Sequence, residues 1–349
     1  MKNIPIIILF SYASILSGQP FLNRVLTPIY VTSSVMFGYD SNVLKLSESE
    51  MDDAGVNKDI LGGMQTFDSG IIRPEMQIEY IPELIRNHET RLVLNASHAV
   101  YSHSRDKSYS SWSVKMETHL GHYSWLKLGY SLQPNIYLRP YIDRDKIDLT
   151  ARSCTFANET IWSSVSFPLF DKTWFTGKVK QVHQYFDESF TEFDTEKRCA
   201  EGRLTTKILN PFRLSLSGGI AHGQNTTHNS GYISTSFDRS YNEKSMAGSL
   251  AYLPKKWIYS VGNSLELTQR FYTSEIIDDP VHAGREQEEI QYRLWIKMKL
   301  QDRIFLELNG KYRERQTYSE YEWVEEFKSY SKIDFWITIS TNTSLDLFY

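Results

Sequence analysis

The sequence predicts an all-β fold: a single up-and-down antiparallel transmembrane β-barrel of about 14 strands, with about 12 to 16 compatible with the pattern. Three observations carry this prediction. Many segments alternate apolar and polar residues with a period of two. Short and long connections between these segments alternate along the chain. Aromatic residues make up 14% of the 349 residues, a composition typical of strands.

The first 18 residues differ from the rest. Lys2 precedes the apolar run "IPIIILFSYASIL", and the small residues Ser17 and Gly18 follow it. A charged start, a short apolar core and a small-residue exit predict a secretory signal peptide over residues 1–18. The alternative is a buried first strand. Residues 19–349 are then expected to form one barrel domain, because no later segment offers the roughly 20 apolar residues of a spanning helix.

The strand pattern is clearest in five segments. They are 71–80 ("IIRPEMQIEY"), 111–119 ("SWSVKMETH"), 289–300 ("EIQYRLWIKMKL"), 303–315 ("RIFLELNGKYRER") and 337–349 ("ITISTNTSLDLFY"). Each places apolar residues on one face and polar or charged residues on the other, as expected of a strand with one wet face. Similar patterns begin near Ile29, Arg91, Tyr123, Thr155, Lys172, Lys197, Pro211, Lys244 and Trp257. Each strand is close to the ~9–11 residues that a tilted strand needs to cross a bilayer.

The connections favour a membrane barrel over a soluble sandwich. Tight links such as "HLGHYSW", "PLFDKTW", "LNPFR", "LPKKW" and "LQDRI" alternate with long polar links such as "LKLSESEMDDAGVNKDILGG" and "GQNTTHNSGYISTSFDRS". Barrels in outer membranes have short turns at one end and long loops at the other. An even number of strands would also place both chain ends on the side of the short turns.

Aromatic residues near the strand ends predict two interfacial girdles. On the turn side these are Trp125, Trp174, Trp257, Tyr80, Phe167, Tyr252 and Tyr349. On the loop side they are Tyr39, Tyr101, Tyr137, Tyr185, Tyr272 and Tyr312.

The last strand resembles the C-terminal signal of Gram-negative outer-membrane β-barrel proteins, in which a terminal aromatic follows alternating apolar residues. The matching positions are Leu345, Leu347 and Tyr349. This resemblance implies export to the outer membrane, recognition by the barrel-assembly machinery, and closure of the last strand against the first. In addition, "FGYDSNVLKLS" at residues 37–47 is similar to the first-strand exit of uncharacterised porin families.

Within this barrel, the alternation predicts a lumen richer in bases than in acids. The predicted pore-lining residues are Arg73, Arg91, Lys115, Lys178, Lys180, Arg293, Lys297, Lys299, Lys311, Arg313 and Glu307. Because the whole chain has a net charge of −4, the missing acids are expected in the long loops, among them Glu48, Glu50, Glu188, Asp279 and Glu326. A basic lumen below an acidic mouth would favour anions. The alternative is that acids and bases pair across the lumen and close it.

Other sites receive little support. The near-balanced charge predicts no nucleic-acid partner, and no hydrolase, zinc or phosphate-loop motif is present. Asp40, Ser41 and Asn42 are interpreted as a loop entry. The acids of the first long loop, Asp52 and Asp53 included, lack the spacing of a calcium loop. Cys154 and Cys199 are expected near one rim on strands separated by a third, so a disulfide would need loop movement.

We therefore expect a porin-like passive channel for small hydrophilic solutes or ions, with a bias towards anions and no cofactor, metal or catalytic step. Its expected partners are outer-membrane lipid, the barrel-assembly machinery and the solutes. The alternative is a non-conducting structural, assembly or surface-binding barrel that engages a protein or polysaccharide. A membrane-embedded hydrolase is the third hypothesis.

Overall fold

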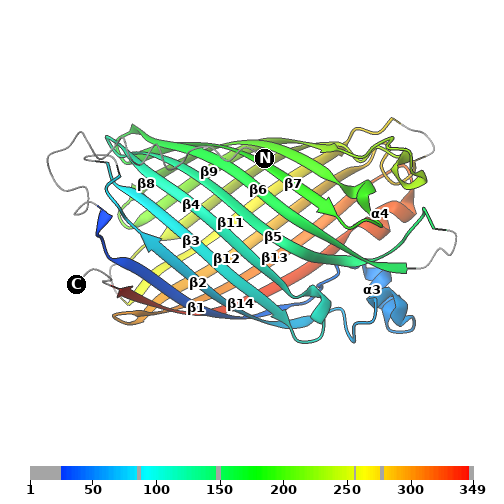
Figure 1. Ribbon diagram of the computed structural model, residues 1–349, viewed down its shortest axis with the longest axis horizontal. Helices are drawn as coiled ribbons and strands as arrows, with labels where there is room; N and C mark the ends of the chain where they lie inside the picture. Colours follow the sequence, from blue (N-terminus) through cyan, green and yellow to red (C-terminus); the bar gives the residue numbers. More distant parts are fainter. Residues whose placement is uncertain (1–24, 85–87, 147–150, 255–256, 276–278, 346–349) are drawn as a thin grey trace, which may run out of the picture.

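The computed structural model describes residues 25–84, 88–146, 151–254, 257–275 and 279–345. These residues form 14 strands around one barrel (Figure 1). The strands are β1 Ile29–Asp40, β2 Ser69–Tyr80, β3 Thr90–Tyr101, β4 Tyr109–Gly121, β5 Ser124–Ile142, β6 Ala151–Phe170, β7 Thr173–Phe186, β8 Thr195–Leu209, β9 Phe212–Asn225, β10 Tyr241–Tyr252, β11 Ile258–Tyr272, β12 Glu286–Gln301, β13 Ile304–Tyr318 and β14 Tyr330–Leu345. The predicted signal peptide lies outside the described residues.

The sheet is closed and antiparallel throughout. Each strand pairs with the next in the chain, and β14 pairs with β1. This last pairing runs from Ile29 opposite Leu345 to Asp40 opposite Asp334. Closure leaves no open sheet edge, which is required of a sheet surrounded by lipid. The predicted fold, and the resemblance to outer-membrane barrels at the level of the fold, are confirmed. Leu347 and Tyr349 lie outside the described residues.

The period of two separates an outer face from an inner face. Large apolar side chains such as Phe37, Ile290 and Ile333 are exposed on the outer face. Their neighbours in each strand point inside, where they form cross-strand ion pairs such as Lys332 with Asp40. A charged side chain facing lipid is costly, so the register that turns charges inward is strongly favoured.

The long connections gather at one end, which we call the loop end, and the short ones at the other, the turn end (Figure 1). The loop end carries the helices α3 Glu48–Ala54 and α4 Glu322–Lys328 and the short 3-10 helices η1 Lys58–Leu61, η2 Arg105–Lys107, η3 Thr191–Phe193 and η4 Ile233–Ser236. None of the helices in the described part of the chain is long and apolar enough to cross a membrane.

The first long loop, residues 41–68, has its own apolar core at the loop end. Ser47 caps α3: its hydroxyl accepts from the Glu50 amide, and its own amide donates to the Glu50 carboxylate. Below the helix, a buried cluster contains Val43, Leu44, Leu46, Ala54, Leu61, Met64 and, from β5, Tyr137. The loop is therefore fastened to the barrel wall by packing.

The prediction of two aromatic girdles is wrong for some of the residues assigned to them. Tyr39, Tyr185 and Tyr312 are exposed on the outer face. Tyr137 is instead buried under the first loop, and Trp174 contacts the inward Lys207. Trp125, Tyr101 and Tyr272 also occupy inward positions of their strands. Nearness to a strand end places a residue at the right depth, but its parity within the strand decides which face it occupies.

Candidate pore and its charged mouth

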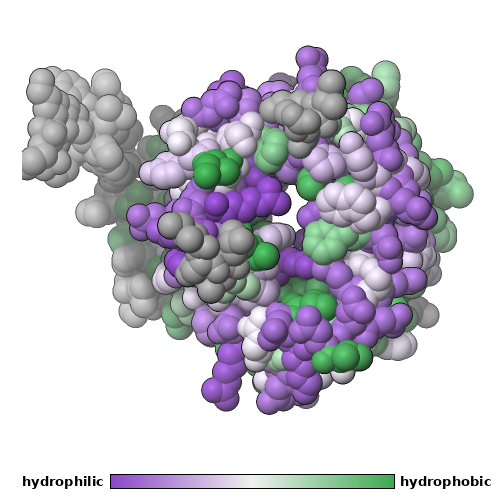
Figure 2. Space-filling model, turned by 90° about the vertical axis from the view of Figure 1, so that its right-hand side faces the viewer, coloured by the Kyte–Doolittle hydropathy of each residue, from purple (hydrophilic) through white to green (hydrophobic). Residues whose placement is uncertain are grey.

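The loop end opens into the barrel interior. Figure 2 looks onto this end and shows an opening near its centre, bordered by mostly hydrophilic side chains. On the wall of β2 to β5, inward hydroxyl and amide groups line a cavity of about 440 Å³. Two of their cross-strand contacts are Ser97 with Ser111 at 2.7 Å and Asn95 with Ser113 at 3.1 Å. This part of the wall is polar and largely uncharged.

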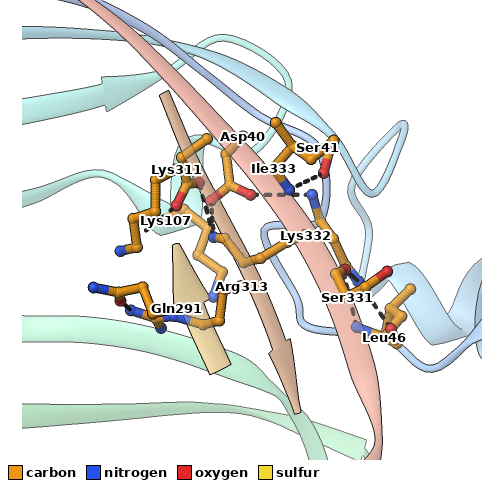
Figure 3. Close-up of polar contacts among 12 residues, drawn as sticks. Asp40, Ser41, Leu46, Lys107, Gln291, Lys311, Arg313, Ser331, Lys332 and Ile333 are labelled. Atoms are coloured by element: carbon orange, nitrogen blue, oxygen red, sulfur yellow. Dashed lines mark hydrogen bonds and ion pairs between the residues drawn. The ribbon is translucent and has the colours of Figure 1, made fainter. Parts of the chain in front are cut away.

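Where β1 meets β14, charged side chains form a network just inside the mouth (Figure 3). The Lys332 ammonium lies 2.6 Å from the Asp40 carboxylate and 3.1 Å from that of Asp334. Asp334 also lies 3.8 Å from Lys311. Asp40 also accepts a hydrogen bond from the backbone amide of Asn42 at 3.0 Å. The predicted loop entry at residues 40–42 therefore supplies the carboxylate that binds the buried ammonium of Lys332. The network ties the last strand to the first.

Basic groups outnumber acids around this network. Arg313 and Arg315 lie 3.4 and 2.8 Å from the one carboxylate of Glu289. From the loops, Lys45 and Lys107 approach the same region. Burial and the nearby Arg315 and Arg313 lower the pKa of Lys45 to about 7. Burial and the proximity of Lys45 lower the pKa of Lys107 to about 7. The mouth therefore gains positive charge as the pH falls through neutrality.

The opposite wall of the mouth repeats this chemistry. Glu243 accepts from Lys197 at 2.6 Å and from Arg270 at 2.9 Å. The guanidinium of Arg270 lies 4.0 Å from the centre of the Tyr241 ring. Here too, one carboxylate, that of Glu243, forms ion pairs with two basic side chains.

The first loop is anchored across the mouth by an ion pair. Glu50 of α3 binds Arg139 of β5, and both side chains are nearly buried. Arg139 also lies 5.3 Å from the ring of Phe327 in α4. Glu50 and Asp279 lie in the long loops, as expected, but both carboxylates are buried. Because Glu50 binds Arg139 and Asp279 contacts His282 at 2.9 Å, neither acid adds free negative charge to the mouth. Glu48, Glu188 and Glu326 are exposed, as expected.

The predicted pore-lining residues all occupy inward positions, but they differ in their partners. Those in ion pairs are Arg73 with Glu75, Arg91 with Glu79, Lys115 with Glu117, Arg293 with Glu307, Lys299 with Asp302, Lys311 with Asp334, and Arg313 with Glu289. In the part of the chain that the structure describes, Lys178, Lys180 and Lys297 form no ion pair. Acids and bases of the lumen therefore pair in many places, as the alternative hypothesis predicted, but basic side chains remain in excess.

Three inward tryptophans lie flat on glycines of the neighbouring strand. They are Trp162 on Gly129, Trp295 on Gly262 and Trp336 on Gly38, and Tyr241 lies on Gly223 in the same way. A Cβ at any of these glycines would come within 2.5 Å of the ring. Over these rings lie the cations of Lys178, Arg293, Arg73 and Arg270, at 4.7, 5.6, 5.3 and 4.0 Å. The glycines thus keep the rings against the wall, and the rings hold basic side chains at fixed places.

Reasoning from sequence missed Lys332, Arg139, Lys45 and Lys107. Lys332 alternates with Asp334 and could have been found by extending the last strand. The two loop lysines carry no sequence signal, because their positions depend on how the loops fold. Cys154 and Cys199 are both free.

No protein-family model matches the sequence, and no curated protein matches it. Among solved structures, the chain is similar to in-vitro folded OmpT, an outer membrane protein of Vibrio cholerae, with 8% identity, coverage of 90% of this chain and 99% of that chain, and a TM-score of 0.45. An anion-selective porin from Comamonas acidovorans matches with 9% identity, 90% and 98% coverage and a TM-score of 0.42. Pseudomonas aeruginosa OprD matches with 8% identity, 91% and 95% coverage and a TM-score of 0.40. Similarity at this level concerns the fold alone, so the site is interpreted from the chain's own residues.

Proposed function

We propose that the protein is a passive, porin-like channel of a Gram-negative outer membrane that conducts small hydrophilic solutes and ions with a preference for anions. The carrying observation is the excess of basic side chains on the inner face of a closed barrel whose outer face is apolar. Transport would be diffusion past fixed charges, with no covalent step and no cofactor. The predicted pore-lining residues take this role in the proposal.

Two features support the membrane placement. The exposed apolar residues of the outer face, such as Phe37, Ile290 and Ile333, would be unfavourable in water and favourable against lipid. The last strand closes the barrel on the first, which fits assembly through the C-terminal segment that ends at Tyr349. A signal peptide over residues 1–18 would bring the chain to this membrane.

The anion preference follows from the charge balance of the lumen. Lys178, Lys180 and Lys297 have no carboxylate partner among the described residues, and Glu243 and Glu289 each serve two bases. A wall of fixed positive charge raises the local concentration of anions and lowers that of cations.

The test is planar-bilayer recording of the refolded barrel under a potassium chloride gradient. We expect stable conductance steps and a reversal potential of the sign that a chloride-selective channel gives. Replacing both Lys178 and Lys180 by Gln should move the reversal potential towards zero. Lys244→Gln is the matched control, because this lysine occupies an outward position of β10 and faces away from the lumen.

Three results would argue against the proposal. Cation-selective steps would contradict the role given to the lumen bases. An equal shift in the Lys244→Gln control would show that surface charge, not the lumen, sets selectivity. No conductance from a barrel whose folding is verified by heat-modifiable mobility would favour the second candidate, a non-conducting structural or surface-binding barrel. The observation that favours this second candidate is the first loop, which packs at the mouth and is anchored there by the Glu50–Arg139 ion pair.

A further inference from the structure

We propose that a groove on the outer face of the barrel binds one phosphate-bearing membrane lipid, with an acyl chain along the groove and the phosphate at Arg198. The groove lies on the other side of the barrel wall from the lumen. Its occupation therefore rests on the membrane placement in the proposed function and does not depend on whether the barrel conducts.

The groove crosses the outer face from β4 to β10 and has a volume of about 1060 Å³. Its sides are apolar side chains exposed on that face, among them Val114, Leu128, Ile161, Val179 and Ile220. It stays open because Ser163 and Ala200, on β6 and β8, lie on either side of Val179 in the register and carry small side chains. In the next outward row towards the turn end, Gly177, Gly202 and Gly218 face one another and have no side chain to fill it.

The groove runs obliquely from the membrane interior to the loop end. On β5 it passes Leu128, four residues from Ser124, where the strand begins at the turn end. On β10 it passes Asn242, one residue from Tyr241, where the strand begins at the loop end. Because barrel strands are tilted, a row at right angles to them rises along the barrel axis. An acyl chain whose head group lies at the loop end extends into the membrane along the same direction.

Polar side chains replace the apolar ones at the loop-end part of the groove. Arg198 of β8 lies beside His222 of β9, which lies beside Asn242 of β10. The Arg198 side chain is 71% exposed, and its Nε donates to the Glu196 carboxylate at 2.7 Å. Among the described residues its two terminal nitrogens have no hydrogen-bond partner, so both are free to donate to a phosphate. The planar guanidinium matches the geometry of phosphate oxygens.

The charge of the groove favours an anionic head group. The charged residues that line it with outward side chains are Arg198 and Lys244, and both are basic. The Lys244 ammonium forms no ion pair among the described residues and lies 5.8 Å from the centre of the Phe271 ring on β11. It adds positive potential, while Arg198 is placed for the direct contact. Glu196 lies one row closer to the loop end and, besides Arg198, accepts from Gln181 at 2.9 Å.

A second hollow on the outer face lacks this charge. It spans β1 to β4, has a volume of about 470 Å³ and includes Val35, Met76 and Ala96 in its lining. None of the described residues that line it is lysine or arginine. It offers an acyl chain apolar surface without a phosphate contact, so it serves as the control.

The test is native mass spectrometry of the refolded barrel in detergent, titrated with dipalmitoyl phosphatidic acid or dipalmitoyl phosphatidylcholine. The two probes have identical acyl chains, but in the second the phosphate carries a cationic choline group. We expect one phosphatidic acid to bind about tenfold more tightly than phosphatidylcholine, because its uncovered phosphate accepts from Arg198. Heat-modifiable mobility verifies that the wild-type protein and every variant are folded.

Substitutions at the two members of one ion pair should have opposite effects. Arg198→Gln should weaken phosphatidic acid binding about tenfold, and Arg198→Lys should restore part of the affinity. Glu196→Gln should strengthen binding about threefold, because it removes a negative charge and releases the Nε of Arg198. A purely structural role of this pair would make both glutamine variants weaker.

A second pair of variants tests the groove itself. Ala200→Phe should abolish the preference for phosphatidic acid, because the ring would fill the groove between Val179 and Ile220, the neighbours of Ala200 in the register. Ala96→Phe is the matched control, since it places the same ring in the second hollow and should leave binding unchanged.

The outcomes separate the lipid site from the channel. Equal affinities for the two lipids, or equal weakening by Arg198→Gln and Glu196→Gln, would overturn the phosphate site. An oligomer of the wild-type barrel that Ala200→Phe dissociates would assign the groove to a second copy of the chain and also overturn it. Selective lipid binding by a barrel that never conducts in planar bilayers would support the lipid site and overturn the channel, and conductance without selective lipid binding would do the reverse.

Discussion

Replacing Gly129 by Ala should push the Trp162 ring off the lumen wall. The added Cβ would lie 2.3 to 2.4 Å from three atoms of the indole ring. Contacts this short are not tolerated, so the ring must rotate towards the lumen. Lys178, whose ammonium lies 4.7 Å from the ring centre, then loses its support. We expect a lower single-channel conductance, because a large side chain enters the pore.

The energetic cost follows from the same contacts. Moving the indole off its preferred rotamer costs about 0.5 to 1.5 kcal/mol. The lost cation–π contact of Lys178 removes about 0.5 to 1 kcal/mol at a partly hydrated site. Alanine offsets part of this by about 0.4 to 1 kcal/mol through the lower entropy of the unfolded chain. The net destabilisation of Gly129→Ala is therefore about 1 kcal/mol.

The assay combines urea unfolding in lipid vesicles with bilayer recording. Gly310→Ala is the matched control, because an added Cβ at this strand glycine would meet no heavy atom within 4 Å. It should leave conductance unchanged and stability equal or slightly higher. Adding Trp162→Leu to Gly129→Ala should restore conductance, since the displaced ring is gone. Identical behaviour of the two glycine variants would refute the reasoning.

Three further predictions concern the mouth. Lys332→Gln leaves the buried Asp40 without its 2.6 Å partner and should lower the free energy of unfolding by about 3 kcal/mol, measured by urea unfolding; a change within about 0.5 kcal/mol would contradict the closing role of this pair. Glu50→Gln removes the anchor to Arg139 and should increase conductance and its fluctuations, whereas unchanged recordings would show that packing alone holds the loop. The pKa of Lys45 is lowered to about 7, so this ammonium is charged below that pH and neutral above it. Anion selectivity should therefore decrease as the pH is raised from about 6 to about 8, and Lys45→Gln should reduce this pH dependence.

Much of the fold could be predicted from local pattern. The segment 289–300 alternates so regularly that its inward charges, Arg293, Lys297 and Lys299, follow from parity alone. Parity also decides the face of the aromatics: Trp125 shares the parity of Lys127 and therefore points inside. Isolated glycines within strand patterns, such as Gly129 and Gly262, signal close approach of a neighbour. That neighbour, however, is known only once the register is known.

The candidate site could be predicted only in part. Ion pairs such as Arg91 with Glu79 join different strands, and their formation depends on pairing register. Lys178 faces Glu201 in the β7–β8 register, but that carboxylate binds Arg203 at 2.9 Å, and Lys180 faces Cys199; neither lysine therefore forms an ion pair among the described residues. Position in the sequence does not show this.

By itself, the sequence determined the alternation of faces, the order of the strands with their approximate number, and the division into short turns and long loops, because each follows from side chains a few residues apart. Only the tertiary structure decided how residues 41–68 pack on Tyr137, which tryptophan covers which glycine, and which lumen charges remain unpaired. These contacts join segments that are distant in the chain, and the closed register of the barrel brings them together.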